Sequence, residues 1–185
     1  MLNSLSNPKT QYYLDFKKWV LSENFFWNYN AEGGVSLQHL ARTNANSSKK
    51  FDSNVPFYTR TFIRRPEIRA FPSIDPWVDP SEVDKVVTVV KEIFNHNNES
   101  FSTLLRLSVN AVHPKSKVVT TIPHYDHQFS HTNFIIYLTD AGGSTFVDDE
   151  KFDPKEDDVI LFKGEHYHNT PVEKRRVILV ATMVE

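Results

Sequence analysis

The spacing of apolar and polar positions changes along this chain of 185 residues, from a helical period to strand-like runs. Residues 11–21 place aromatic and aliphatic side chains at helical spacing, with Lys17 and Lys18 on the other side. This pattern predicts a short amphipathic helix.

A second apolar stripe predicts a longer helix; it consists of Val83, Val86, Val87, Val90, Ile93 and Phe94. Asp79 can cap its N-terminus, Pro80 suits the first helical turn, and Glu82 occupies the acidic position of a capping box. Valines form helices poorly in isolation. We therefore expect this helix to depend on packing against one face of a sheet.

From residue 104 onward, short β-rich runs follow one another at close intervals. They are Leu104–Val112, Val118–Ile122, Asn133–Thr139, Thr145–Val147, Val159–Phe162 and Arg176–Val184. Their composition predicts strands. Helices first and strands afterwards predict an α+β fold, and the length suits a single domain over residues 1–185.

Residues 24–71 fit neither period. They contain Gly33-Gly34, a polar stretch from 43 to 53, and aromatic residues separated by prolines. Such composition predicts an irregular arm with short strands, which we expect to cover the mouth of a site as a lid. Residues 1–100 would then supply N-terminal helices and this arm, and residues 104–183 the core.

Charge and composition exclude several classes of function. A formal net charge of −2 gives no overall attraction to nucleic acids or anionic membranes. The absence of cysteine excludes disulfides, thiolate metal ligands and a cysteine nucleophile. No apolar run is long enough to span a membrane, and the first ten residues lack a signal-peptide pattern. We expect a cytoplasmic protein with no membrane partner.

The candidate chemistry centres on His124-Tyr125-Asp126. Residues two apart in a strand point to the same face, so His124 and Asp126 can contact one ion. A second histidine would complete two histidines and one carboxylate, which suits a non-haem Fe(II) centre with open positions. Zinc also accepts such ligands. The candidates for the third ligand are His166 and His168, again two residues apart.

The motif series from Leu104 to Met183 resembles the 2-oxoglutarate/Fe(II)-dependent dioxygenases, and within them a prolyl-hydroxylase-like and phage-encoded branch. The resemblance runs through HYDH, YLTDAGGSTF, FKGEHYH and RRVILV. It implies a double-stranded β-helix (jelly-roll) core, here with the N-terminal helices packed on the sheet. It also implies Fe(II), 2-oxoglutarate and O2, and it leaves room for ascorbate as an additional reductant.

The same resemblance favours His168 as the third metal ligand beside His124 and Asp126. In the family, the distal histidine follows a strand phenylalanine in the form F-x-G-x-x-x-H, and Phe162 to His168 has that form. His166 is the alternative.

2-Oxoglutarate needs a cation at its far carboxylate, and a guanidinium matches a carboxylate bidentately. The resemblance gives this role to Arg176, which directly precedes the apolar run of the last strand. Arg175 is the alternative, since adjacent strand residues face opposite sides. The resemblance to prolyl hydroxylases also implies that Tyr137 donates its hydroxyl to the same carboxylate. Asn110 and Thr145 are further candidates for lining the co-substrate site.

The resemblance implies a hydroxylase that releases succinate and CO2 and acts on a protein or peptide. A nucleic-acid dealkylase or hydroxylase of the same superfamily is an alternative, because aromatic residues are interleaved with Arg60, Arg64, Arg65 and Arg69. A solvated arm, or internal pairing of these arginines with the acidic residues 148–150, is the more ordinary account. A third alternative is a non-catalytic metal-binding jelly-roll domain. A phage-encoded enzyme would work in the host cytoplasm.

Overall fold

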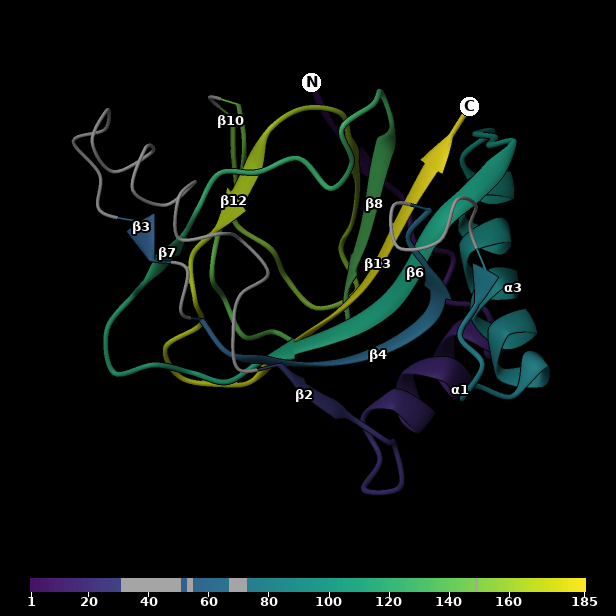
Figure 1. Cartoon of the computed structure of the whole chain (residues 1–185), viewed down its shortest axis with the longest axis horizontal. Coiled ribbons are helices and arrows are strands. Elements are labelled where there is room, and N and C mark those ends of the chain that lie inside the picture. The colour runs from purple at the N-terminus through teal and green to yellow at the C-terminus, as the bar shows by residue number, and fades with distance from the viewer. Residues whose placement is uncertain (31–50, 53–54, 67–72, 149) are drawn as a thin grey trace.

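The computed structural model describes residues 1–30, 51–52, 55–66, 73–148 and 150–185. Its helices α1 and α3 lie together on one side of a large sheet (Figure 1). The elements are β1 (Leu2–Leu5), α1 (Gln11–Val20), β2 (Asn28–Asn30), β3 (Phe51–Asp52), β4 (Phe57–Arg64), β5 (Ser73–Ile74), α3 (Pro80–His96), β6 (Thr103–Val112), β7 (Thr120–Thr121), β8 (Thr132–Tyr137), β9 (Thr145–Val147), β10 (Glu150–Phe152), β11 (Val159–Phe162), β12 (His166–His168) and β13 (Arg176–Val184).

Two sheets enclose the interior of the molecule. The main sheet has the strand order β1-β11-β8-β13-β6-β4-β2, with β5 paired to β4, and its neighbouring strands are antiparallel. A smaller sheet has the order β10-β9-β12, and β3 pairs with β7. Figure 1 shows β10 and β12 across the interior from β4 and β6. This architecture is a double-stranded β-helix, so the predicted fold class is confirmed.

Alternation along the central strands gives the main sheet two different faces. Successive strand residues point to opposite sides, and one set on β6, β8 and β13 packs against the helices. This set includes Leu107, Val109, Phe134, Ile136, Leu179 and Ala181. The intervening residues line the interior; among them are Arg106, Asn110, Asn133, Ile135, Arg176 and Ile178. Polar groups can therefore stand within apolar strands without entering the hydrophobic core.

Helix α3 begins at the predicted cap, but Glu82 pairs with Arg60 instead of completing a capping box, and Val89 rather than Val87 lies on the buried face. The Asp79 carboxylate accepts a hydrogen bond from the backbone N–H of Ser81 at 2.8 Å, and Pro80 occupies the first turn. Its buried face consists of Val83, Val86, Val89, Val90, Ile93 and Phe94, which all belong to the main core. The valine-rich helix is thus held by its contact with the sheet.

Some elements differ from the prediction. The prediction of an irregular arm is wrong for Phe57–Arg64. This segment forms an eight-residue strand between β6 and β2. Strand β1 was not predicted and extends the main sheet beyond β11. The strand predicted at 118–122 is reduced to Thr120–Thr121. Most of the proposed lid within 24–71 lies outside the described residues. In the described ranges, neither helix has the length and apolar character needed to cross a membrane.

Candidate metal and co-substrate site

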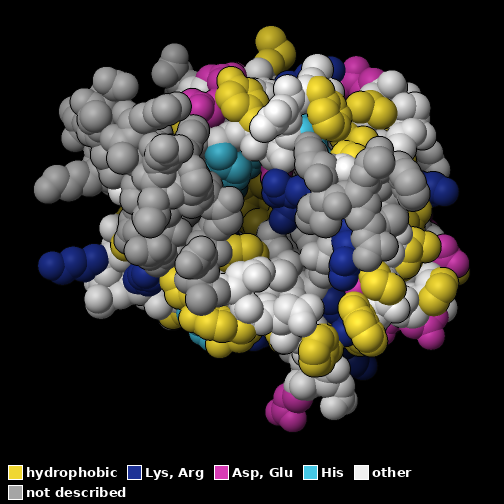
Figure 2. Space-filling view, in the orientation of Figure 1, with side chains coloured by type: hydrophobic (Ala, Val, Ile, Leu, Met, Phe, Trp, Pro, Cys, Tyr) yellow, Lys and Arg dark blue, Asp and Glu magenta, His cyan; other side chains and the backbone are white. Residues whose placement is uncertain are grey.

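The interior between the two sheets contains a cavity of about 1270 Å³. Side chains from β4, β6, β8, β12 and β13 line it, together with the segment between β7 and β8. Figure 2 shows a hollow in this face of the molecule, with histidine and basic side chains at its edge. The volume lies above the roughly 300–1,000 Å³ of ordinary small-molecule pockets.

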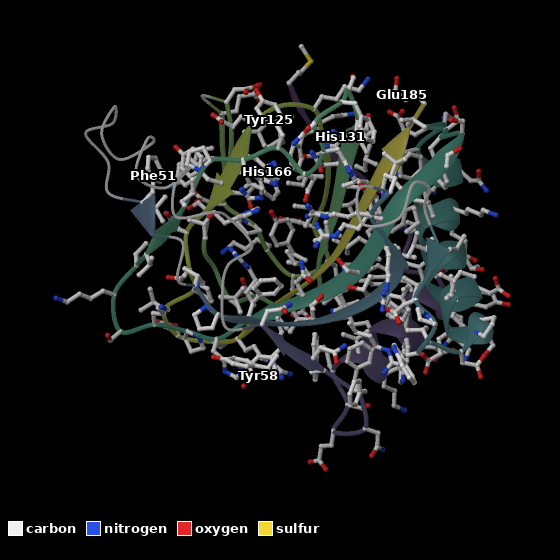
Figure 3. All side chains as sticks on the ribbon, viewed as in Figure 1. Phe51, Tyr58, Tyr125, His131, His166 and Glu185 are labelled. Carbon is white, nitrogen blue, oxygen red and sulfur yellow. The ribbon has the colours of Figure 1, made fainter. Side chains whose placement is uncertain are left out.

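His124 and His166 are paired through their backbones. Each N–H donates to the other residue's carbonyl at 3.0 Å. This antiparallel bridge brings the two ring centroids to 4.4 Å. Nε2 of His166 also lies 3.7 Å from Oδ2 of Asp126. The structure therefore brings His124, Asp126 and His166 together, and Figure 3 shows His166 directed into the interior.

His168 has different partners. It also faces the cavity, and its ring centroid lies 5.4 Å from that of His166. Its Nδ1 is 2.8 Å from the Thr145 hydroxyl, which in turn is 2.6 Å from the Tyr137 hydroxyl. The histidine preferred from the sequence as third ligand thus lies among the predicted co-substrate residues, whereas the alternative, His166, lies beside Asp126. The bridge to His124 causes this difference, because it fixes His166 at the level of the HxD motif.

The donor atoms that His124, Asp126 and His166 offer, two imidazole nitrogens and a carboxylate oxygen, have the chemistry that suits a divalent metal. Nδ1 of His124 is 2.9 Å from the Ile122 carbonyl, which places a proton on Nδ1 and leaves Nε2 as the ligand atom. Burial, with His124 nearby, lowers the pKa of His166 to about 3, so this ring is neutral at pH 7. Atoms bound at about 2.1 Å to one ion lie roughly 3–4 Å apart, and the 3.7 Å separation agrees with that.

These three side chains are neighbours, but their present positions do not form a metal-binding geometry. In the part of the chain that the structure describes, no three His, Cys, Asp or Glu side chains are placed so that they could hold a metal ion together. Nδ1 of His166 is buried and has no hydrogen-bond partner.

Two arginines hold the Asp126 carboxylate. Its Oδ1 accepts from Nη2 of Arg65 at 2.6 Å and from Nη1 of Arg106 at 2.8 Å. Arg65 also donates to the Asp126 backbone carbonyl at 3.0 Å. Burial by itself would raise the pKa of Asp126, but Arg106 and its other positive neighbours lower it below the usual range. The carboxylate is therefore ionised, and Oδ2 is left facing His166.

Arg176 is buried at the other end of the site. Its Nη1 donates to the carbonyls of Gly143 and Asn169, both at 2.9 Å, while its Nε is buried without a partner. Burial lowers the pKa of Arg176, but a guanidinium remains charged at neutral pH. An unpaired buried donor is costly, and a carboxylate would satisfy it. The adjacent Arg175 points away, with its guanidinium 5.8 Å from the Trp27 ring.

The other predicted co-substrate residues fall into two groups. Tyr137 and Thr145 form one chain of hydrogen bonds with His168, and burial raises the pKa of Tyr137 to about 12, so its hydroxyl stays protonated. Asn110 faces the cavity from β6, but its side-chain oxygen accepts from the Thr59 hydroxyl at 2.7 Å.

Sequence reasoning missed Arg106 and misjudged the arginine cluster. Arg106 interrupts the apolar run of β6 at a cavity-facing position, which is the signal that could have found it. Arg60 pairs with Glu82, Arg64 with Asp75 and Arg65 with Asp126. The expected pairing with residues 148–150 is therefore wrong for these three arginines, and Arg69 lies outside the described residues.

The sequence matches no protein-family model and no curated protein. The structure, in contrast, is similar to solved oxygenases over nearly its whole length. A 2OG-Fe(II) oxygenase family oxidoreductase from Burkholderia pseudomallei aligns with a TM-score of 0.51 and 14% identity, over 96% of this chain and 92% of that one. A prolyl-4-hydroxylase from Pseudomonas putida gives 0.44 and 10%, over 95% and 100%. A prolyl hydroxylase from Trichoplax adhaerens, in complex with a hypoxia inducible factor peptide fragment, gives 0.45 and 10%, over 96% and 94%. The alignment with the Burkholderia protein shows that this chain has the same fold as a 2-oxoglutarate/Fe(II) oxygenase.

Proposed function

We propose that the protein is an Fe(II)- and 2-oxoglutarate-dependent dioxygenase that hydroxylates a C–H bond of a protein or peptide. The observation that carries the proposal is the grouping of His124, Asp126 and His166 in one cavity that also holds the buried Arg176. Two histidines and a carboxylate on one side of an ion leave positions open for a co-substrate and O2. In this proposal His166, rather than His168, is the third ligand.

When bound, Fe(II) with 2-oxoglutarate and O2 supplies the oxidising chemistry: 2-oxoglutarate becomes succinate and CO2, and one oxygen atom enters the C–H bond as a hydroxyl. The side chains have the task of binding and orientation. Arg65 and Arg106 occupy Oδ1 of Asp126, so that Oδ2 is the oxygen offered to the metal.

The co-substrate would lie between the metal ligands and Arg176. The guanidinium would bind the far carboxylate, which supplies an acceptor for the unpaired Nε. The protonated Tyr137 hydroxyl would donate to the same carboxylate, and His168 would orient Thr145 beside it. Ile135, Ile178 and Val180 line the same cavity and would keep water away from the reacting groups.

A peptide substrate agrees with the mouth of the cavity. Tyr125 and Phe129 line the cavity and are 58% and 44% exposed, so they offer apolar contacts to an incoming chain. Figure 3 places Tyr125 on the same side of the interior as His131 and His166. The nucleic-acid alternative loses support, because Arg60 and Arg64 are paired with acidic residues and offer little free charge to a phosphate backbone.

The direct test is succinate formation from 2-oxoglutarate with Fe(II) and O2, screened against peptides, free amino acids and oligonucleotides. We expect peptide-dependent succinate release by the wild type and none by Asp126→Ala. Release that depends only on oligonucleotides would instead assign the reaction to nucleic acid. Absence of any 2-oxoglutarate turnover, in a protein that still binds metal, would leave the metal-binding scaffold.

A further inference from the structure

An excess of positive charge surrounds Asp126. Arg65 and Arg106 donate to the same carboxylate oxygen, although a single guanidinium is enough to hold a carboxylate. Of the described residues that line the cavity, the other acidic one is Asp75, and it pairs with Arg64 at 2.8 Å. Asp126 balances only one of the two guanidinium charges beside it. The other has no acidic partner among these lining residues.

Loading the site as proposed above does not remove this excess. The two positive charges of the metal and the two negative charges of 2-oxoglutarate cancel. Arg65, Arg106 and Arg176 then face a single carboxylate, that of Asp126, among the described lining residues. Uncompensated charge in a partly desolvated cavity is unfavourable, and a substrate anion would compensate it.

Arg65 is the arginine that a substrate can reach. Its side chain is 34% exposed, compared with 14% for Arg106, while both touch Asp126. A group bound to the outer side of Arg65 would consequently lie next to the metal ligands. Figure 2 shows basic side chains at the edge of the hollow.

We infer that the substrate carries a carboxylate close to the carbon that is hydroxylated, and that Arg65 binds this carboxylate. The inference rests on the proposed function and narrows its substrate class to an acidic peptide. A single anionic group suits the site better than a polyanion, since Arg60 and Arg64 on the preceding strand β4 are neutralised by Glu82 and Asp75. Lys163 also lines the cavity, and it pairs with Glu185 at 2.8 Å. Its charge is therefore balanced as well.

The test uses Mn(II) in place of Fe(II), without oxygen, so that weak ligands can be observed without turnover. Capped tripeptides Gly-X-Gly with X as Asp, Glu, Asn or Gln are added to the Mn(II)- and 2-oxoglutarate-loaded protein. Paramagnetic relaxation of the X protons reports their proximity to the metal. Arg65→Gln removes the proposed contact, and Arg64→Gln is the matched control, because Arg64 lines the same cavity but pairs with Asp75. Calorimetry first measures binding of Mn(II) and 2-oxoglutarate to each protein.

We expect the Asp and Glu peptides to be relaxed about fivefold more than their amide counterparts, as for a partly exposed ion pair. Arg65→Gln should abolish this preference and Arg64→Gln should retain it. Equal relaxation of acids and amides, no relaxation of any peptide, or a preference that survives Arg65→Gln would overturn the inference. So would stronger relaxation of a single-stranded oligonucleotide at the same concentration.

Two further results separate this inference from the proposed function. A wild type that binds no 2-oxoglutarate contradicts the function itself, whereas normal 2-oxoglutarate binding without acid preference contradicts only the substrate class. If Arg65→Gln fails to bind Mn(II), the wild-type preference is measured at low and high salt. An ion pair with the exposed Arg65 should weaken with salt, and a preference unaffected by salt would overturn the inference.

Discussion

At the scale of single residues, His166 and His168 show how two like side chains acquire different roles. Both lie on β12 and face the same cavity. His166 bridges to His124 and lies beside Asp126, whereas His168 bonds to Thr145. Their partners are set by strand pairing rather than by the chemistry of imidazole.

The first prediction separates the two histidines by metal affinity. His166→Ala should weaken Mn(II) binding about 100-fold or more, because it removes a ligand and not only a group that supports one. His168→Ala should have a small effect on Mn(II) and a larger one on 2-oxoglutarate. Calorimetric titration of both variants provides the measurement. The opposite order of effects would make His168 the third ligand.

The second prediction concerns Gly143, whose backbone lies against Arg176. Its φ is +83°, and a Cβ there would come within 2.6 Å of the Asn169 carbonyl oxygen and 2.9 Å of Nη1 of Arg176. Gly142 has φ +66° but no atoms within 4 Å of its Cβ position, so Gly142→Ala is the matched control. Both substitutions strain the backbone.

Gly143→Ala should destabilise the protein by about 1–3 kcal/mol more than Gly142→Ala, because overpacking adds to the strain. It should also weaken 2-oxoglutarate, since Arg176 must move. Thermal unfolding and calorimetry measure the two effects. Equal destabilisation by the two variants would show that the close approach to Arg176 does not constrain this position.

At the scale of elements, hydrogen bonds and ion pairs hold helix α1 against the segment before β11. The Asp157 carboxylate accepts hydrogen bonds from the Tyr13 hydroxyl and from Lys17, and it forms an ion pair with Lys9 at 2.9 Å. Burial alone would raise the pKa of Asp157, but the contacts with Lys17, Tyr13 and Lys9 lower it. The helix is therefore held by charge as well as by its apolar face.

The third prediction follows from the sign of this shift. The folded pKa of Asp157 lies below its unfolded value of about 3.9. Its contribution is therefore present above pH 4 and is lost as the pH falls through the folded pKa. Asp157→Asn should cost about 1–2 kcal/mol of unfolding free energy at pH 6, and the difference from wild type should shrink below pH 4. Denaturant unfolding at both pH values measures it; a difference independent of pH would contradict the account.

Element prediction succeeded where one period dominates and failed where a strand has polar residues on both faces. The stripe of α3 and the apolar run of β13 were predicted, because each buries one continuous face. Strand β4 was not predicted. Its Thr59 and Thr61 face the cavity, Arg60 pairs with Glu82 on the other side, and a bulge interrupts the register between Thr61 and Ile63. These features remove the alternation on which sequence reasoning depends.

At the scale of the whole molecule, the site is assembled from segments that are far apart in the sequence. Arg65 follows β4, Arg106 is on β6, Asp126 lies between β7 and β8, and Arg176 begins β13. Strand alternation indicated that Arg175 and Arg176 face different sides. It also predicted one strand face for His124 and Asp126, but in the structure His124 forms an isolated bridge and Asp126 lies in a bend outside the strands. Alternation could not indicate which strands become neighbours. The ion pairs of two arginines with Asp126, and the bridge between His166 and His124, are therefore visible only in the three-dimensional structure.

The central claim is that one cavity binds a metal and 2-oxoglutarate together. Calorimetric titration of 2-oxoglutarate into the Mn(II)-loaded protein without oxygen tests it most directly. We expect the wild type to bind 2-oxoglutarate. In Arg176→Ala the binding free energy should be weaker by about 2–5 kcal/mol, because the substitution removes one partner of a desolvated charge pair.

Arg175→Ala is the matched control and should bind 2-oxoglutarate normally, because Arg175 lies over Trp27 outside the cavity. Arg176→Ala should still bind Mn(II), which keeps the two ligands distinguishable. A wild type that binds Mn(II) but no 2-oxoglutarate at millimolar concentration would contradict the account.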